Sequence, residues 1–419
     1  MISKTSECFV YITLPGETQS VTAGRFVLTK NRQGTALGQF VYAKSYLSRA
    51  DAVAIDPVEL KLSDSTYETT RLGGIFGALR DSGPDYWGRC VIERHTGRSQ
   101  LTELDYLLES PDDRAGALGF GLNTKSLAPK RKFNKTIELT KLQRIAESLI
   151  RDEIGKPNDE TVQVQELMLI GTSMGGARPK TVVEDENGLW VAKFNRPDDH
   201  WNYTRVEHAM LELARSCGVS AAISRIETIG RKDVLLIQRF DREKIANGYR
   251  RARMISGLTI LRADESPEIR DRWSYILLCE ELRRVVAQPK KDAAELFRRM
   301  CFNALISNID DHPRNHALIA KNLDWQLSPA YDLTPSPVVS QDRRDLAMSC
   351  GDQGRFANAN NILSQCSRFL LDKDEAKAIV SKMTKQVRAS WYKVVRSYGV
   401  SEKDAEAIKS AFVYEGFDR

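Results

Sequence analysis

The hydrophobic pattern divides the chain into a strand-rich first part and a helix-rich second part. Up to about residue 127, short alternating segments such as FVYITL and RFVLTK are separated by Gly and Pro, a pattern typical of small strands. A few helical stretches are expected to follow these strands, including one near residues 86–95. Beyond about residue 263, apolar residues recur at helical spacing. This order favours an α+β fold with two lobes.

The middle of the chain predicts a β-hairpin framed by helices. Apolar residues at helical spacing predict a helix over 137–154. An Asn-Gly pair, 187–188, separates strands expected at 181–183 and 189–194, which is a strong hairpin signal. The next helix should end at Gly218, because glycine is typical after a helix C-terminus.

The remaining elements follow from the same periodicities. Strands are expected at 221–226 and 234–237, and helices at 272–286, 293–306, 375–397 and 403–412. The polar, basic segment 128–135 is the first candidate boundary. We therefore expect three parts, at 1–127, 128–240 and 241–419.

Composition and charge restrict the class of protein. The chain has 42% hydrophobic and 28% charged residues, as ordinary soluble globular proteins do. It has no apolar run of about 18 residues, so no membrane anchor is expected. The seven cysteines are scattered without a C-x-x-C pair, which argues against a disulfide framework or a zinc site and indicates a reducing cytoplasm. The net charge of +6 is mild and the basic runs are short, so a nucleic-acid surface is not favoured.

A Gly-rich segment and a lysine-bearing strand form the first candidate site. Residues 171–180 read GTSMGGARPK, and glycines let backbone N–H groups approach a phosphate closely. The segment is neither a Walker A loop nor G-x-G-x-x-G, so a tight connection is the alternative. Lys193 follows in WVAKF, and in protein kinases a similar strand presents its lysine to nucleotide phosphates. A lysine on the solvent face of the strand is the equally weighted alternative.

The second candidate site is the stretch SNIDDHPRNHALIA, residues 307–320. Asp310 and Asn315 have the spacing of the kinase catalytic loop H-R-D-x-x-x-x-N, in which the aspartate accepts the hydroxyl proton and the asparagine helps to hold Mg²⁺. A further oxygen ligand should lie beyond them. Asp332, after a strand-like run, is the candidate, and a strand-turn-strand hairpin would bring it back to Asn315.

Two other interpretations of these residues stay open at this point. Each polar group could simply brace a turn. A metal hydrolase could use Asp310, Asp311, His312, His316 and Asp332 as ligands, but this leaves the Gly-rich segment and Lys193 without a role, and no H-E-x-x-H pair supports it. The order of the motifs along the chain favours a bilobed phosphotransferase.

These segments resemble, in order and spacing, the signature segments of the HipA family of serine/threonine kinases, which are toxins of bacterial type II toxin–antitoxin modules. The segments are SMGGARPKT (173–181), VAKF (191–194), QRFDR (238–242), NIDDHPRN (308–315) and AYD (330–332). Upstream, YITLPG (11–16), AGR (23–25), SYL (45–47), DPVEL (56–60) and PDYWG (84–88) are similar to the N-terminal subdomain of that family. The resemblance covers most of the chain.

The resemblance implies a bilobed protein-kinase-like α+β fold: an N-terminal HipA-type subdomain, a kinase N-lobe with the Gly-rich loop and a helical C-lobe with the catalytic loop. It implies ATP and Mg²⁺ as cofactors, Asp310 as the catalytic base, and Asn315 and Asp332 as Mg²⁺ ligands. The residues implied in ATP binding are Gly175, Gly176, Ala177, Arg178, Pro179, Lys180, Lys193, Gln238, Arg239, Phe240, His312, Pro313, Arg314, Asn315, Tyr331 and Asp332.

The resemblance also implies regulation and partners. Ser173, or Thr172 beside it, matches the autophosphorylated residue whose modification switches the family's kinases off. A small helix-turn-helix antitoxin would bind the chain, operator DNA would be reached mainly through that antitoxin, and the substrate would be a cellular protein such as an aminoacyl-tRNA synthetase. A non-catalytic, nucleotide-binding partner protein on a kinase fold is the remaining alternative.

Overall fold

The computed structural model describes residues 6–418 except 100, 126–132, 152–177, 267, 338–339 and 341. The chain forms two compact units. Unit 1 contains Met1–Arg196, Gln238–Ile255 and Ile319–Asp324, and unit 2 contains Pro197–Ile237, Ser256–Leu318 and Trp325–Arg419. Each unit is therefore assembled from segments that are far apart in sequence.

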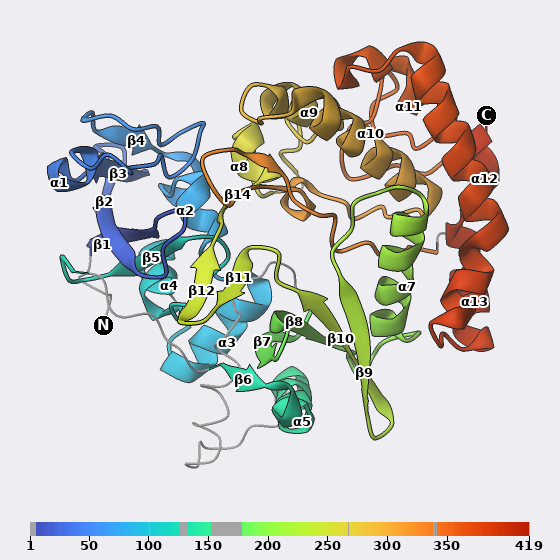
Figure 1. Cartoon of the computed structure of the whole chain (residues 1–419), viewed down its shortest axis with the longest axis horizontal. Helices are drawn as coiled ribbons and strands as arrows, with labels where there is room; N and C mark the ends of the chain where they lie inside the picture. The colour runs from blue at the N-terminus through green and yellow to red at the C-terminus, as the bar shows by residue number, and fades with distance from the viewer. Residues whose placement is uncertain are drawn as a thin grey trace. The chain divides into compact units, whose positions relative to one another are not determined.

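Unit 1 begins with a five-stranded antiparallel sheet in the order β4-β3-β2-β1-β5 (Figure 1). Its strands are β1 (Glu7–Thr13), β2 (Ser20–Lys30), β3 (Ala36–Tyr42), β4 (Tyr67–Thr69) and β5 (Leu118–Gly121). Alternating apolar residues of these strands are buried, with Phe26 and Phe40 at 0% exposure. The predicted strands in FVYITL and RFVLTK are confirmed.

Short helices accompany this sheet. They are α1 (Lys44–Leu47), η1 (Arg71–Gly73), α2 (Gly77–Asp81), α3 (Tyr86–Thr96) and α4 (Glu103–Glu109). The α3 helix starts where Asp85 accepts a hydrogen bond from the Gly88 backbone, and Gly97 ends it with a φ of 65°. The helix predicted near residues 86–95 is thus confirmed.

The predicted hairpin forms the second part of unit 1. Strand β7 (Lys180–Asp185) pairs antiparallel with β8 (Gly188–Phe194), and Gly188 in the turn has a φ of 129°. Strand β6 (Asn134–Lys135) lies parallel to β7. The unit also holds η2 (Thr136–Glu138), α5 (Leu139–Arg151) and the hairpin of β11 (Arg242–Ile245) with β12 (Gly248–Arg251).

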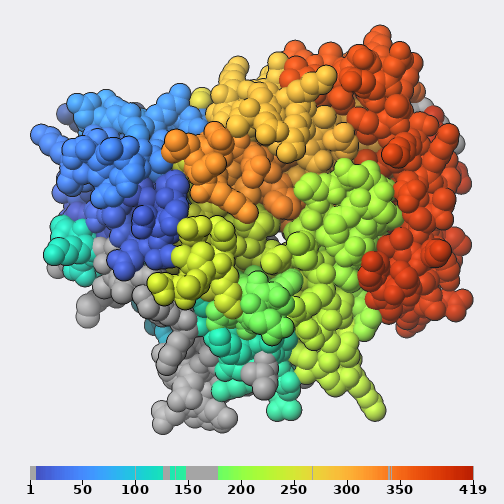
Figure 2. Space-filling model, in the orientation of Figure 1, coloured from blue at the N-terminus to red at the C-terminus, as the bar shows by residue number. Residues whose placement is uncertain are grey.

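Unit 2 is mostly helical and is built around α7 (Tyr203–Ser216), α9 (Tyr275–Arg283), α10 (Pro289–Leu305) and α12 (Lys373–Ser397). The α12 helix begins with a capping box between Asp372 and Glu375. Its buried residues Ala376, Val380, Met383 and Val387 recur at helical spacing and form the face that contacts α7 and α10. Figure 2 shows the red surface of these C-terminal helices beside the green surface of α7.

The smaller elements complete the described chain. Strand β9 (Ser224–Ile229) pairs antiparallel with β10 (Lys232–Gln238). The others are β13 (Arg253–Ser256), α8 (Gly257–Leu261), η3 (Pro313–Asn315), β14 (Ala317–Ala320), β15 (Gln326–Leu327), α11 (Ala359–Ser364), η4 (Cys366–Phe369), α13 (Glu402–Ile408), η5 (Lys409–Ala411) and η6 (Glu415–Asp418). The four helices predicted beyond residue 263 correspond to α9, α10, α12 and α13 with η5.

Candidate active site

The loop that carries Asp310 is held in place at its start by the turn after α10. The last residues of this helix are fully buried, and Ser307 then reverses the chain with a φ of 51°. The Ser307 hydroxyl donates to the backbone oxygen of Ala411 at 2.7 Å and also contacts the guanidinium group of Arg344. A non-glycine residue in this conformation is strained, so these contacts keep the loop in a defined path.

Asp310 and Asn315 lie on the same loop with different exposure. Asp310 is exposed, whereas Asn315 in η3 is 7% exposed. The Asn315 side-chain nitrogen donates to the Asp310 backbone oxygen at 3.3 Å. The amide oxygen of Asn315 is then the atom that a hard cation such as Mg²⁺ would use.

The segment Ala330-Tyr331-Asp332 returns to this loop, as the predicted hairpin requires. The Ser328 backbone N–H donates to the Ala317 oxygen at 2.9 Å, which pairs the chain segments on either side of the turn. The Tyr331 hydroxyl donates to the Arg314 backbone oxygen at 2.8 Å, and the Asn308 side chain donates to the Asp332 backbone oxygen at 3.3 Å. The structure therefore brings the Asp332 segment beside the loop of Asp310 and Asn315.

The electrostatics of this site are acidic. Partial desolvation is the main factor that raises the pKa of Asp310. The negative charges of Asp332 and Asp311 raise this pKa further, and His312 and Arg270 act to lower it. Three carboxyl groups near one another disfavour the ionised state until a cation offsets them. This is the electrostatic setting in which a divalent cation is bound favourably.

The other predicted residues of this loop have structural contacts of their own. Pro313 is buried, and Arg314 forms an ion pair with Glu265. The half-buried His312 ring lies 6.3 Å from the Trp273 ring, and its Nδ1 atom has no hydrogen-bond partner among the described residues. Their contacts with ATP stay predictions.

The geometry does not agree with the metal-hydrolase alternative. Asp311 and His316 are buried, and their side chains bond to each other at 2.8 Å instead of pointing at a shared ion. Among the residues described, no three His, Cys, Asp or Glu side chains are arranged to hold a metal ion. Mg²⁺ is bound differently, through one or two carboxylates together with phosphate oxygens and waters, so it needs no such cluster.

In unit 1, the two predicted lysines occupy opposite positions of the hairpin, since Lys180 on β7 pairs with Lys193 on β8. Lys193 is half-buried, whereas Lys180 is 1% exposed and its ammonium group lies 2.5 Å from the Asp85 carboxylate. The Trp87 indole also donates to the Lys180 backbone oxygen at 3.1 Å. Lys180 is thus engaged by the segment PDYWG, and its contact with phosphate stays a prediction.

The segment QRFDR is held by a buried charge cluster. Gln238 ends β10, and the Arg239 backbone N–H donates to the Leu189 oxygen at 2.9 Å. The Arg239 guanidinium contacts Asp113 at 2.6 Å and Asp241 at 2.9 Å. Burial acts to raise the pKa of Asp241, but the positive charges of Arg239 and Arg242 outweigh it and lower that pKa. The side chain of Arg239 is therefore structural, which leaves backbone groups of Gln238, Arg239 and Phe240 as the predicted nucleotide contacts.

The Gly-rich loop is only partly within the described chain. Gly175, Gly176 and Ala177 lie outside the described residues, as do Ser173 and Thr172. Pro179 accepts a hydrogen bond from the Phe194 backbone at 3.1 Å, so the end of the loop is joined to β8. Arg178, immediately before it, is half-buried.

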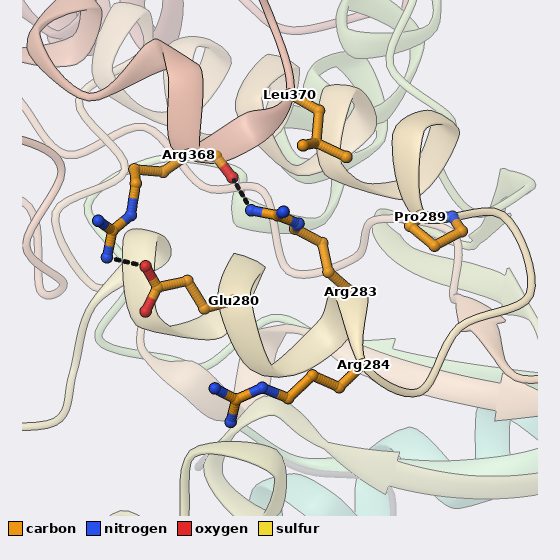
Figure 3. Close-up of a pocket in the computed structure, with 6 residues that line it drawn as sticks. All are labelled: Glu280, Arg283, Arg284, Pro289, Arg368 and Leu370. Carbon is orange, nitrogen blue, oxygen red and sulfur yellow. Dashed lines mark hydrogen bonds and ion pairs between the residues drawn. The ribbon is translucent and has the colours of Figure 1, made fainter.

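A separate pocket of unit 2 lies between α9, η4 and the start of α10 (Figure 3). Its volume is about 630 Å³, and it is lined by Glu280, Arg283, Arg284, Pro289, Arg368 and Leu370. Its arginines have local partners: Arg368 pairs with Glu280, Arg284 pairs with Glu281 at 2.9 Å, and Arg283 donates to the Arg368 oxygen at 3.2 Å. None of the sequence-predicted site residues lines it.

Sequence reasoning missed the residues that hold the site residues in place. Asp85 could be expected to cap α3, since it precedes an apolar helical segment, but its pairing with Lys180 could not. Asp113 and Tyr275 carry no motif signal of their own, and Asn308 lies in the segment NIDDHPRN but was given no role there. No helix in the described part of the chain combines the length and the hydrophobicity that crossing a membrane requires.

Comparisons with known proteins give consistent results. The chain resembles Shewanella oneidensis HipA, solved in a complex with HipB and operator DNA, with a TM-score of 0.68 and 16% identity, over 96% of this chain and 94% of that one. It is 24% identical over 163 residues to "Putative kinase Y4mE" of Sinorhizobium fredii, which is 37% of each protein. It is 22% identical over 250 residues to a Haemophilus influenzae protein with the name "Putative kinase", over 52% of this chain and 70% of that protein. The chain thus spans little more than a third of the length of the first of these curated relatives.

The family signatures cover both parts of the chain. The HipA N-terminal domain matches residues 19–121, and the HipA-like C-terminal domain matches residues 172–391, which is more than half of the chain. The predicted α+β fold of HipA type is confirmed by the structural likeness. The chain belongs to the HipA family, whose curated relatives carry kinase names.

Proposed function

We propose that this protein is an ATP- and Mg²⁺-dependent serine/threonine protein kinase and the toxin of a HipA-type toxin–antitoxin module. The observation that carries the proposal is the convergence of Asp310, Asn315 and Asp332. Two side-chain hydrogen bonds, from Asn308 to the Asp332 backbone and from Tyr331 to the Arg314 backbone, join the two segments, and the bond from Asn315 to the Asp310 backbone lies within the loop. This is the arrangement of base and cation ligands that phosphoryl transfer uses.

Each residue then has a defined task in the reaction. Asp310 accepts the proton of the attacking serine or threonine hydroxyl, and its raised pKa makes it a stronger base than an ordinary aspartate. The hydroxyl oxygen forms a bond to the γ-phosphorus, and the bond from that phosphorus to the β–γ bridging oxygen breaks to release ADP. The oxygens of Asn315 and Asp332 would hold Mg²⁺, which when bound would offset the negative charge of the phosphates.

The unit 1 residues would bind the nucleotide. Lys193 would contact the α- and β-phosphates from β8, and the backbone of Gln238, Arg239 and Phe240 would receive the adenine. The rigid support of both elements favours this role, since β8 pairs with β7 and the Arg239 side chain is fixed by two carboxylates. Autophosphorylation at Ser173 or Thr172 would add roughly −1.5 to −2 charges near the phosphates and oppose ATP binding.

The partners proposed for the chain follow from its likeness to the Shewanella complex. A HipB-like helix-turn-helix antitoxin would bind it, and operator DNA would be reached mainly through that antitoxin. The substrate would be a cellular protein, of which an aminoacyl-tRNA synthetase is the example implied by the family resemblance. These assignments rest on the fold and family rather than on a surface of this chain.

The test is incubation of the purified protein with γ-labelled ATP and Mg²⁺, followed by intact-mass measurement and peptide mapping. Asp310→Asn should lower phosphate incorporation by about 10²- to 10⁴-fold, the usual contribution of a general base. Asp324→Asn, which changes an exposed aspartate outside the site, is the matched control and should incorporate phosphate normally. ATP binding without incorporation in the wild type would favour the non-catalytic partner protein instead.

A further inference from the structure

A buried hydrogen-bond network lies directly behind the proposed catalytic loop. Asp311, Tyr275 and His316 are 1%, 0% and 2% exposed. The Tyr275 hydroxyl and His316 Nε2 both contact the same Asp311 oxygen, His316 at 2.8 Å. A carboxylate oxygen can accept hydrogen bonds from a hydroxyl and from a ring N–H at the same time. The His316 and Tyr275 rings also meet edge to face, with centroids 5.5 Å apart.

The network continues from Tyr275 to the segment of Asp332. Asn303 of α10 donates to the Tyr275 hydroxyl at 3.3 Å, and Asn308 donates to the Asn303 side-chain oxygen at 3.1 Å. Asn308 also donates to the Asp332 backbone oxygen at 3.3 Å. Asp332 has a φ of 60°, which a non-glycine residue keeps only when its surroundings determine it.

These contacts surround the proposed reacting groups without including them. Asp311 is the chain neighbour of Asp310, and His316 is the chain neighbour of Asn315. Burial and the adjacent Asp311 charge raise the pKa of Tyr275 well above its ordinary value, so its hydroxyl keeps its proton and stays a donor. Asp311 and His316 are held against Tyr275 of α9, so the backbone positions of their neighbours Asp310 and Asn315 are restricted as well.

We infer that Tyr275, Asp311 and His316, continued through Asn303 and Asn308, are positioning residues that hold Asp310, Asn315 and Asp332 in their working geometry. This inference rests on the proposed kinase function. Because Tyr275, Asp311 and His316 are buried behind the loop, they would act on the reaction through the backbone of the catalytic loop. Alignment of this kind affects turnover, since small misplacements of reacting groups are costly.

The test is Tyr275→Phe, which removes one hydroxyl and keeps the buried ring. The catalytic constant for phosphate transfer should fall roughly 10- to 100-fold, as outer-shell changes typically do. The KM for ATP should stay within about twofold, because the proposed adenine and phosphate contacts lie on other residues. Hydrogen exchange of the peptide covering residues 308–316 should become faster.

Tyr46→Phe is the matched control, since Tyr46 is 1% exposed and its hydroxyl donates to the Val53 oxygen at 2.7 Å in unit 1. It should show a similar loss of thermal stability with normal turnover. If Tyr275→Phe does not fold, His316→Leu and the conservative His316→Gln replace it, and only the glutamine, which keeps a donor, should retain turnover.

Three results test whether this network positions the proposed site residues. A folded Tyr275→Phe protein that turns over like Tyr46→Phe would overturn the inference. Loss of turnover together with faster exchange in the catalytic loop would support it. If the wild type itself transfers no phosphate, the proposed function fails, and the exchange measurement alone then decides: unchanged exchange rejects the positioning role and faster exchange retains it.

Discussion

The buried carboxylates that contact or adjoin the proposed site residues are compensated differently in the two units. In unit 1 they face full positive charges, with Asp85 beside Lys180 at 2.5 Å and Asp113 beside Arg239 at 2.6 Å. In unit 2 the buried Asp311 accepts hydrogen bonds from the hydroxyl of Tyr275 and the ring of His316. In unit 1 these two carboxylates are therefore held by ion pairs, whereas in unit 2 the carboxylate next to the proposed reacting groups is held by hydrogen bonds.

The difference matches what each region does in the proposed kinase. The charge pairs of unit 1 join the segment matched by the HipA N-terminal domain to the strands of the HipA-like C-terminal domain. A buried ion pair holds two segments together effectively, because removing one partner destabilises the protein far more than the intact pair stabilises it on balance. Burial raises the pKa of both Asp85 and Asp310, but Lys180 opposes this effect at Asp85, whereas the charges of Asp332 and Asp311 add to it at Asp310. The acidic loop of unit 2 therefore favours an incoming cation.

The largest effect is expected where a full charge pair is broken. Asp85→Asn keeps the side-chain shape and an oxygen to cap α3, but it removes the carboxylate that lies beside the buried Lys180 ammonium group. The free energy of unfolding should fall by about 3–5 kcal/mol, measured by urea denaturation. The double variant Asp85→Asn with Lys180→Met, which removes both charges, should recover much of this loss.

The exposed pair Arg388–Asp418 provides the control for that experiment. Its side chains are 55% and 57% exposed, and solvent screens such pairs strongly. Asp418→Asn should leave the urea midpoint unchanged. An equal loss of stability in Asp418→Asn and Asp85→Asn would mean that burial does not set the strength of these pairs.

The contrast also shows what sequence reasoning can and cannot reach. The proximity of the Asp332 segment to the loop of Asp310 and Asn315 was predictable, because kinase chemistry demands fixed spacings along one loop and its following hairpin. The hairpin itself followed from Asn187 and Gly188. Local spacing and turn chemistry are written into neighbouring residues, so they can be recognised without the fold.

The supporting contacts could not be predicted in the same way. Lys180 and Asp85 are 95 positions apart, and Arg239 and Asp113 are 126 positions apart. No periodicity relates such positions, and a single buried aspartate in a sequence looks like any turn or cap residue. Lys180 shows the consequence, because its motif suggests phosphate contact while its burial reveals a tie to the N-terminal segment.

A smaller effect is expected from a buried carboxylate of unit 1 that has no charge partner among the described contacts. Asp56 is 0% exposed and accepts hydrogen bonds from the Val58 and Glu59 backbones. Burial raises its pKa from 3.8 to about 6. The folded state thus binds this proton more tightly than the unfolded state, and the resulting stability is full below about pH 4 and is lost as the pH rises through 6.

Asp56→Asn removes this dependence because its amide does not titrate. The two pKa values differ by an amount that corresponds to on the order of 3 kcal/mol. The free energy of unfolding of the wild type minus that of the variant should decrease by up to this amount as the pH rises from 4 to 7. A constant difference would show that Asp56 titrates normally despite its burial.

The smallest change in stability is expected in unit 2, at Asp310, where the effect on activity should be large. Its pKa is raised in the folded protein, so its ionised form opposes folding at neutral pH instead of supporting it. Asp310→Asn should therefore unfold at the same urea concentration as the wild type or at a higher one, in contrast to Asp85→Asn. Added Mg²⁺ with ADP should raise the urea midpoint of the wild type, since a ligand that binds only the folded state stabilises it. The increase should be smaller for Asp332→Asn, because this variant lacks a proposed Mg²⁺ ligand. A clear loss of stability in Asp310→Asn would place Asp310 among the structural ties and remove the distinction between the two units.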